Sequence, residues 1–268
     1  MNNNQVVSKK KRIRQSRNKF ILSIIILIAA FVLGSFGIYK YFFEDNSYLT
    51  PTVKEIIKES KDNPGGNSEV IEPYVNELPG YRQSYNNDYI VAQLKMSSVK
   101  IDTLITRAKN NSYYLDHNLY NGYDTMGTPF IDYRNTDLAN NRQINIYGHN
   151  TQYSQYYDKL PFTNLEAYTD ENVFNNYKDV ILNTDSGQYK YKVIAVKVVT
   201  DVDYEHMKVV FYSDSDWLQH VNKLLSNTMY IDSASANIGV NDKLLVLQAC
   251  HYDPMGSYIL IICKKIWK

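Results

Sequence analysis

Cysteine is nearly absent from this 268-residue sequence, which has only Cys250 and Cys263. Two cysteines exclude a framework of several disulfides, so a fold of this size depends on an ordinary hydrophobic core. The two could pair in an oxidising compartment, but Cys263 ends the apolar run Ile259–Cys263 and is expected to be a core residue. No cysteine or histidine pair has zinc-site spacing, so we expect no metal and no cofactor.

Acidic residues are missing from the first 43 positions, whereas residues 1–19 hold seven Lys and Arg. The next twenty residues, Phe20–Tyr39, are uncharged and mostly apolar, which matches a bilayer core of about 30 Å. The charge asymmetry predicts a cytoplasmic basic N-terminus over 1–19, a single transmembrane signal-anchor over 20–43 and an extracellular remainder. The alternative is a cleaved signal peptide, whose apolar region would be shorter and would end in a small-x-small site.

Basic residues are scarce after the expected anchor. Eight of the 29 Lys and Arg lie at or before Lys40, which leaves 21 against 28 acidic residues in the exported part. Binding to a phosphate backbone depends on clustered Lys and Arg. We therefore expect no nucleic-acid partner, and membrane topology accounts for the basic N-terminus.

The exported part divides into two segments. Residues 44–80 are expected to be a stalk and N-terminal helical segment, because Thr52–Glu59 reads as a short amphipathic helix behind Pro51. A break rich in Pro, Gly and Asn follows at 63–68. Residues 81–268 are expected to form the main domain.

This main domain is predicted to be mostly β. One amphipathic helix interrupts the strands, since Trp217, Val221 and Leu224 follow the capping cluster Ser213–Asp216 at helical spacing. Many short strands with few helices favour a closed or sandwich-like β-architecture. The expected strands are rich in Val, Ile and Tyr: Tyr89–Lys95, Val99–Ile105, Gln143–Tyr147, Val180–Asn183, Tyr189–Thr200, Lys243–Ala249 and Tyr258–Ile266.

Two residues about a hundred positions apart carry the chemistry. His149 and Cys250 each stand where an apolar, strand-like run breaks into polar residues, so each is expected at a strand end. A thiol with a pKa of about 8.5 needs a basic or cationic neighbour to act as a nucleophile at neutral pH. Taken singly, each has a structural alternative, because an isolated cysteine is usually a small buried hydrophobe and an isolated histidine a satisfied polar group.

Five segments, in order, resemble the sortases, and among them class B. The similarity runs over about residues 85–266. The segments are a tyrosine-rich stretch (Asn110–Leu119), a strand and turn (Gly127–Asn135), a histidine motif (Tyr147–Asn150), a helix (Ser215–Ser226) and a cysteine strand (Asp242–Cys250).

The resemblance implies a closed eight-stranded sortase-type β-barrel with N-terminal helices and one helix before the last strand pair. It implies a transpeptidase in which the Cys250 thiolate attacks the Thr carbonyl of a C-terminal sorting motif on an exported protein. His149 would protonate the leaving amine and then deprotonate an amine of a peptidoglycan precursor. Two alternatives stay open: a sortase-fold protein that binds sorting peptides or cell wall without efficient turnover, and a hydrolase that uses water as acceptor.

The sequence departs from the family at one catalytic position. Sortases have an arginine on the strand after the cysteine, and here that position is Tyr258; no arginine follows Arg142. A missing oxyanion donor typically lowers the rate about 10²- to 10³-fold. Three interpretations stay open: the Tyr258 hydroxyl donates in place of arginine, Arg134 or Lys264 fills the gap, or the chain is no longer a competent transpeptidase.

The other histidines are expected to be non-catalytic. His251, with Asp253 two residues on, is read as loop polarity, with a second general base as the alternative. His117, His206 and His220 lie in polar contexts and are predicted to be surface residues.

Overall fold

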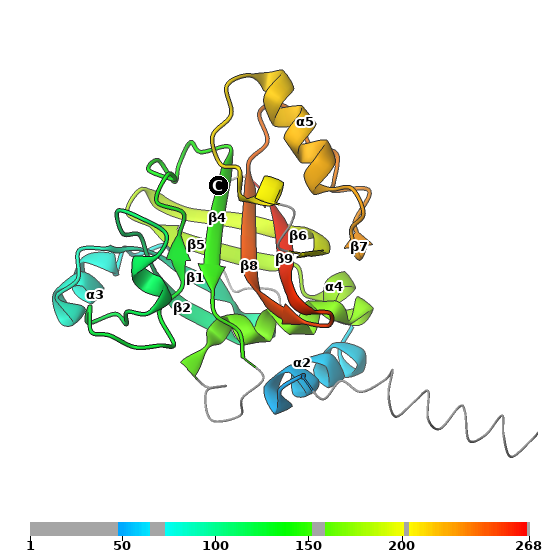
Figure 1. Ribbon diagram of the computed structural model, residues 1–268. Helices are drawn as coiled ribbons and strands as arrows, with labels where there is room; N and C mark the ends of the chain where they lie inside the picture. The colour runs from blue at the N-terminus through cyan, green and yellow to red at the C-terminus, as the bar shows by residue number, and fades with distance from the viewer. Residues whose placement is uncertain (1–47, 65–72, 152–158, 201–203, 267–268) are drawn as a thin grey trace, which may run out of the picture. The chain divides into compact units, whose positions relative to one another are not determined.

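The computed structural model describes residues 48–64, 73–151, 159–200 and 204–266 (Figure 1). The basic N-terminus and the signal-anchor expected over 20–43 lie outside these ranges. Within them, no helix has the length and apolar character that crossing a membrane requires. The chain divides into two compact units, of which the second, Leu49–Lys268, is the unit described below.

One sheet of nine strands forms the centre of the described unit. Eight strands close into a ring in the order β5-β1-β2-β3-β4-β8-β9-β6, and the pairing of β5 with β6 completes it. The predicted mostly β, closed eight-stranded barrel is thus confirmed. The strands are β1 (Ile90–Met96), β2 (Ile101–Thr106), β3 (Phe130–Ile131), β4 (Gln143–Gly148), β5 (Asp179–Thr184), β6 (Gly187–Thr200), β7 (Tyr230–Ile231), β8 (Leu244–Tyr252) and β9 (Met255–Ile266).

The ninth strand, β7, pairs only with β6, outside the ring. Two residues cannot show an alternating pattern, so the sequence does not predict it. Each of the seven strands expected from composition is present, with bounds that shift by one to a few residues.

Helix α2 (Pro51–Asp62) packs against the barrel unit. Thr50 caps it by accepting a hydrogen bond from the Val53 amide (3.1 Å), and Pro51 occupies the first turn, where its missing N–H is not needed. Its apolar face buries Val53 and Ile56 completely, in contact with α4 (Glu171–Asn176) and the 3₁₀ helix η4 (Pro161–Thr169). Part of the segment expected as a stalk and helical segment therefore belongs to the packed unit.

Helix α5 (Asp214–Leu224) confirms the expected helix before the last strand pair. The Ser213 hydroxyl accepts from the Asp216 amide, which caps the first turn. At the other end, the buried Lys197 ammonium donates to the carbonyls of Lys223 (3.1 Å) and Leu224 (3.3 Å), where a cation complements the helix dipole. The remaining α-helix, α3 (Leu78–Tyr85), agrees with the N-terminal helices that the resemblance implies, although no pattern in the sequence predicted its bounds. Neither α4 nor η4 was expected.

Strand β8 is buried on both of its sides from Leu244 to Ala249. Leu244 and Val246 pack in one cluster with Trp217 of α5, and this face of the β4–β8–β9 sheet is called the α5 side. Alternate residues point to the opposite face, called the η4 side. Because successive residues of a strand point to alternate faces, two neighbouring residues near the end of a strand are assigned to opposite sides.

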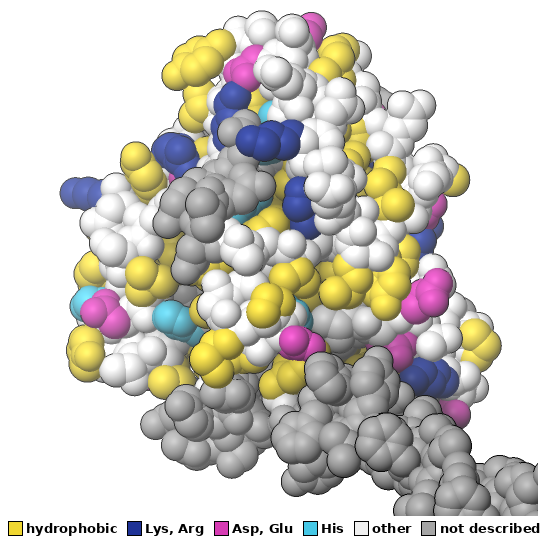
Figure 2. All heavy atoms as spheres, turned by 45° about the vertical axis from the view of Figure 1, so that its right-hand side comes forward, with side chains coloured by type: hydrophobic (Ala, Val, Ile, Leu, Met, Phe, Trp, Pro, Cys, Tyr) yellow, Lys and Arg dark blue, Asp and Glu magenta, His cyan; other side chains and the backbone are white. Residues whose placement is uncertain are grey.

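The surface carries charges of both signs. On the face in Figure 2, hydrophobic side chains are interspersed with polar ones, and acidic and basic groups both occur. Several tyrosines contribute exposed apolar surface, since Tyr120, Tyr123 and Tyr212 have exposed fractions of 69%, 72% and 91%.

Candidate active site

Strands β4 and β8 bring the two predicted catalytic residues to the same place. They pair in parallel from Gln143↔Leu244 to Gly148↔Ala249, and Figure 1 shows them side by side and pointing to the same end of the barrel. His149 and Cys250 are each the next residue after the last pair. Alternation puts both on the α5 side, in line with Val246. Parallel register thus places a histidine and a cysteine a hundred residues apart on one face and at one level.

Tyr258 lies directly opposite Cys250. Strands β8 and β9 are antiparallel, and Cys250↔Tyr258 is one of their registered pairs. Side chains of such pairs share a face, with Cβ atoms about 4.5–5.5 Å apart. Tyr258 is half-buried and packs against the apolar cluster on the α5 side. The structure therefore puts a phenol where the family pattern predicts arginine, beside the predicted nucleophile.

Lys264 does not fill the missing arginine's position. It pairs with Leu244, at the opposite end of β8 from Cys250. It lies six positions along β9 from Tyr258, a span of about 20 Å. Its ammonium donates to the Asn237 carbonyl (2.9 Å) and pairs with Asp242 (3.2 Å). The interpretation in which Lys264 substitutes for arginine is wrong.

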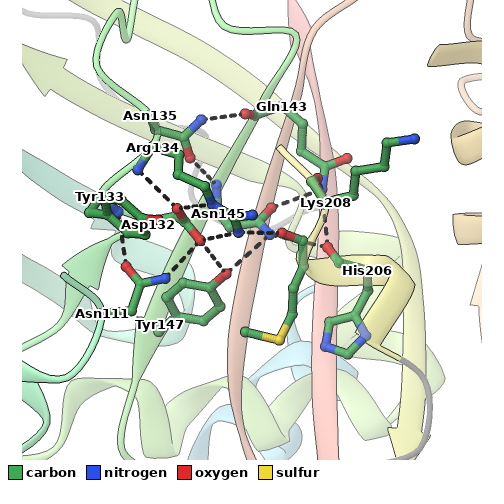
Figure 3. A network of polar contacts seen from close by, with 11 residues as sticks. Asn111, Asp132, Tyr133, Arg134, Asn135, Gln143, Asn145, Tyr147, His206 and Lys208 are labelled. Atoms are coloured by element: carbon green, nitrogen blue, oxygen red, sulfur yellow. Dashed lines mark hydrogen bonds and ion pairs between the residues drawn. The ribbon is translucent and has the colours of Figure 1, made fainter. Parts of the chain in front are cut away.

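Arg134 is likewise held elsewhere, in the polar network of Figure 3. Its Nε and Nη2 donate to the two oxygens of Asp132 (2.8 and 2.7 Å), and Nη2 also donates to the Met207 carbonyl (2.8 Å). Burial acts to raise the pKa of the Asp132 carboxyl, but hydrogen bonds from Arg134 and Asn111 outweigh it and hold the pKa below its ordinary value. If Arg134 left this site, the fully buried Asp132 carboxylate would lose its ion-pair partner. We therefore reject Arg134 as the replacement for the arginine.

The same network binds the segment after β6 to strand β4. Gln143 and Asn145, both buried, donate to the His206 carbonyl (3.2 and 3.1 Å), and Gln143 also donates to the Lys208 carbonyl (3.0 Å). Figure 3 shows these side chains pointing from β4 toward the short 3₁₀ helix η5 (Tyr204–Met207). The α5 side of β4, leading to His149, is therefore lined by side chains whose polar groups are bound.

The His149 imidazole is oriented by a backbone carbonyl. Its Nε2 lies 2.7 Å from the Leu115 oxygen, and a carbonyl can only accept, so Nε2 carries a proton. Nδ1 is then the nitrogen that can exchange a proton during a reaction.

Leu115 belongs to the tyrosine-rich segment, which folds around a glycine. Gly127 has φ +58°, and a Cβ there would lie 2.4 Å from the Tyr114 carbonyl, so only glycine fits. The Tyr114 hydroxyl bonds to Asn87 and Asn121 (2.9 and 2.8 Å). This packing fixes the carbonyl that orients His149.

Gly148, the residue before His149, allows close packing against η4. A Cβ at this position would lie 2.5 Å from the Phe162 ring. We expect Gly148→Ala to lower the free energy of unfolding by about 1–3 kcal/mol, the usual penalty of overpacking, and to displace His149. Urea unfolding followed by circular dichroism measures it.

Gly80 provides the matched control for that substitution. It lies in α3, and a Cβ there would meet nothing within 4 Å. Gly80→Ala should leave stability unchanged or raise it by up to about 1 kcal/mol, because alanine favours helix. Equal stabilities of the two variants would contradict the packing argument.

Three histidines differ from their predicted surroundings. His206 and His220 are buried, not surface residues, with exposed fractions of 6% and 1%. His220 Nε2 bonds to Gln143 (2.8 Å) and its ring stacks near Trp217. The surface prediction failed because a buried histidine with a hydrogen-bond partner cannot be distinguished, in sequence, from a solvated histidine.

The interpretation of His251 as loop polarity is also wrong, and so is its alternative as a second base at the reacting thiol. His251 is 2% exposed and, one residue after Cys250, points to the η4 side, where Nδ1 contacts Glu166 Oε2 at 2.8 Å. Glu166 was not predicted, since it lies in a 3₁₀ helix without periodicity. His117 is partly exposed and pairs with Asp116 (2.7 Å).

The two cysteines differ in surroundings and are not joined. Both are free; Cys250 is partly exposed and Cys263 is buried. Burial raises the pKa of the Cys263 thiol well above its ordinary value, which confirms it as a core residue. Among the described residues, no group of three or more His, Cys, Asp and Glu could hold a metal ion.

No model of a protein family matches the chain. It is 27% identical to Sortase B of Listeria monocytogenes over 63% of this chain and 65% of that protein, just under two thirds of its length. It is 23% identical to Sortase B of Staphylococcus aureus over 67% of this chain and 71% of that protein.

A solved structure supports the same relationship at the level of fold. The crystal structure of Clostridium perfringens sortase B superimposes with a TM-score of 0.63 and 24% identity, over 70% of this chain and 99% of that one. Sequence and structure together confirm that the chain resembles the class B sortases and adopts their fold.

Proposed function

We propose that this chain is a membrane-anchored cysteine transpeptidase of the class B sortase kind. It would cleave a C-terminal sorting motif of an exported protein after Thr and transfer that protein to an amine of a peptidoglycan precursor. The observation that carries the proposal is the parallel β4–β8 register, which puts His149 and Cys250 on one face, one residue beyond the last pair. Residues 20–43 would hold the enzyme in the cell membrane with its catalytic domain outside.

The reaction begins at the Cys250 thiolate. It attacks the Thr carbonyl carbon, and the carbonyl electrons move to the oxygen of a tetrahedral intermediate. As that intermediate collapses, the C–N bond breaks and His149 gives a proton to the departing amine. A thioester between Cys250 and the Thr acyl group remains, and the energy of the broken amide is kept in it.

The second half reverses these proton movements. The amine of the cell-wall precursor attacks the thioester carbonyl, His149 removes its proton, and Cys250 leaves as the thiolate. One amide replaces another, so the reaction needs no external energy source and no metal. The hydrogen bond from Nε2 to the Leu115 carbonyl would hold the His149 ring in one orientation during both proton transfers.

Tyr258 is the group opposite Cys250 that can serve the developing oxyanion. A phenol offers one neutral donor, whereas an arginine offers a charged fork, and charge-assisted hydrogen bonds are about twice as strong. We therefore propose a slower enzyme than one with arginine at that position.

The second candidate is a sortase-fold protein that binds sorting peptides or cell wall with little turnover. The lack of an arginine opposite Cys250 favours this candidate, because Arg134 and Lys264 are both engaged elsewhere. In this case Cys250 would react with alkylating reagents no faster than an ordinary thiol.

Mass spectrometry of the purified full-length chain separates the two. The chain is incubated with peptides of the Asn-Pro-x-Thr and Leu-Pro-x-Thr types, with and without an added amine. Transpeptidation predicts an acyl adduct on Cys250 and an amine-dependent product. An adduct released only to water indicates hydrolysis, and peptide binding without any adduct supports the second candidate.

A further inference from the structure

The residues that directly follow His149 and Cys250 meet at one buried carboxylate. Asn150 follows His149 and His251 follows Cys250, and both bond to Glu166 of η4. Asn150 Nδ2 donates to Glu166 Oε1 (2.8 Å), and His251 Nδ1 lies 2.8 Å from Oε2. Their exposed fractions are 6% for Asn150, 2% for His251 and 1% for Glu166. Two distant segments are thus joined through a third.

Side chains continue the β4–β8 connection where the backbone pairing ends. The last registered pair is Gly148↔Ala249. Beyond it, Asn150 Nδ2 donates its second hydrogen to the Cys250 carbonyl (2.8 Å), and the Tyr252 hydroxyl donates to the Asn150 carbonyl (2.8 Å). The orientation of the Asn150 amide therefore contributes to the separation of the His149 and Cys250 backbones.

Glu166 sets that orientation. Asn150 can hold both the carboxylate and the Cys250 carbonyl only with its NH₂ group turned to the η4 side, and its Oδ1 then accepts from the Thr151 amide (2.7 Å). Without Glu166, one donor of the buried amide would lose its partner, and the amide would be free to turn away from Cys250.

The carboxylate and His251 form a pair that retains a proton. Burial raises the pKa of Glu166, against hydrogen bonds from His251 and Asn150. Burial acts to lower the pKa of His251, but its hydrogen bond to Glu166 and the charge of Glu166 outweigh it, and the pKa lies above its ordinary value. A shared proton keeps Nδ1 as a donor, which locks the carboxylate from its second side.

We propose that Glu166 is a positioning residue for the reaction, which holds His149 and Cys250 at reacting distance through Asn150 and His251. It touches neither substrate nor thiol, because it lies on the η4 side whereas Cys250 and His149 face the α5 side. The inference rests on the proposed function only in taking these two residues as the reacting pair.

The test uses the pH profile of Cys250 alkylation by iodoacetamide, mapped by mass spectrometry, on the full-length chain. This profile reports how closely the imidazole supports the thiolate, and it needs no sorting peptide. We expect Glu166→Ala to slow alkylation at pH 7 about ten-fold or more and to move the profile to higher pH. With peptide, kcat should fall about 10- to 100-fold while KM changes little.

Two further variants separate geometry from charge. Glu166→Gln can accept from Asn150 and donate to unprotonated His251, so it should keep the profile and kcat within about threefold of wild type. A loss in this variant as large as in Glu166→Ala would overturn positioning in favour of a charge effect. Asn150→Ala removes the other partner of the Asn150–Glu166 hydrogen bond and should change the alkylation profile and kcat as Glu166→Ala does. The proposal therefore stays testable if Glu166→Ala does not fold.

Gln93→Ala is the matched control. Gln93 of β1 is also buried and bonds to Asp102 (2.6 Å) and Asn183 (3.2 Å), on a strand that pairs with neither β4 nor β8. It should lower stability without moving the thiol profile. If Glu166→Ala and Asn150→Ala behave like this control, the carboxylate is structural only and the proposal is overturned. A wild-type Cys250 with an ordinary thiol profile and no acyl adduct would instead refute the proposed function.

Discussion

Cys250→Ala is expected to abolish both the acyl adduct and the amine-dependent product. Among the residues that the structure describes, Cys250 is the one thiol on the α5 side at this level of the sheet. Loss of a covalent nucleophile typically lowers kcat by about 10⁴-fold or more. Intact-mass spectra of the variant after incubation with each sorting peptide measure the first effect. Chromatography of the peptide products measures the second.

Cys263→Ala is the control that the chain itself provides. Cys263 is the other thiol, it is fully buried on β9, and it pairs with Leu245 in the ladder, far from the strand end that carries Cys250. Its removal should lower stability by about 1 kcal/mol and leave adduct formation intact. If Cys250→Ala still forms product, the assignment of Cys250 as the nucleophile is refuted. The same holds if Cys250→Ala and Cys263→Ala lose product equally.

Tyr258→Phe is expected to lower kcat about 10²-fold with a smaller change in KM. The substitution keeps the ring and its packing and removes only the hydroxyl, so it deletes the proposed oxyanion donor. Single-turnover measurement of acyl-enzyme formation gives the rate of the chemical step. Tyr230→Phe is the control, since it removes a hydroxyl that donates to the Thr169 carbonyl (3.0 Å), away from the strand end.

Tyr258→Arg tests the same position in the opposite direction. A guanidinium at the position across from Cys250 supplies a charged, two-pronged donor, and we expect acylation faster than in the wild type. If Tyr258→Phe acylates at the wild-type rate and Tyr258→Arg brings no gain, the hydroxyl has no part in the chemistry. Tyr258 would then be a packing residue, consistent with its contact to the apolar cluster.

Much of the fold could be predicted because its signals are local. Alternating Val, Ile and Tyr residues predict strands wherever one or both faces are buried, and β6 and β9 were expected within a few residues of their bounds. The capping Ser213 and the spacing of Trp217 and Val221 predict α5 for the same reason. Strand β7 was missed because two residues cannot show a period, and η4 was missed because its nine residues show no regular apolar pattern.

The candidate site was predictable only in part. His149 and Cys250 could be found because each ends an apolar run, which a single sequence displays. Tyr258 could be placed only by comparison with the order of the family's segments, and the pairing of Cys250 with Tyr258 supports that placement. The exclusion of Arg134 and Lys264 required their actual partners, Asp132 and Asp242.

The sequence by itself determined which segments become strands, which helix interrupts them and which two polar residues, His149 and Cys250, follow the apolar runs of the central strands. Only the tertiary structure decided how these pieces meet. The parallel pairing of β4 with β8 brings together residues a hundred positions apart, and Glu166 joins them from a third segment. Periodicity and capping depend on neighbours in the chain, whereas register and buried hydrogen bonds depend on neighbours in space, and a single sequence records only the former.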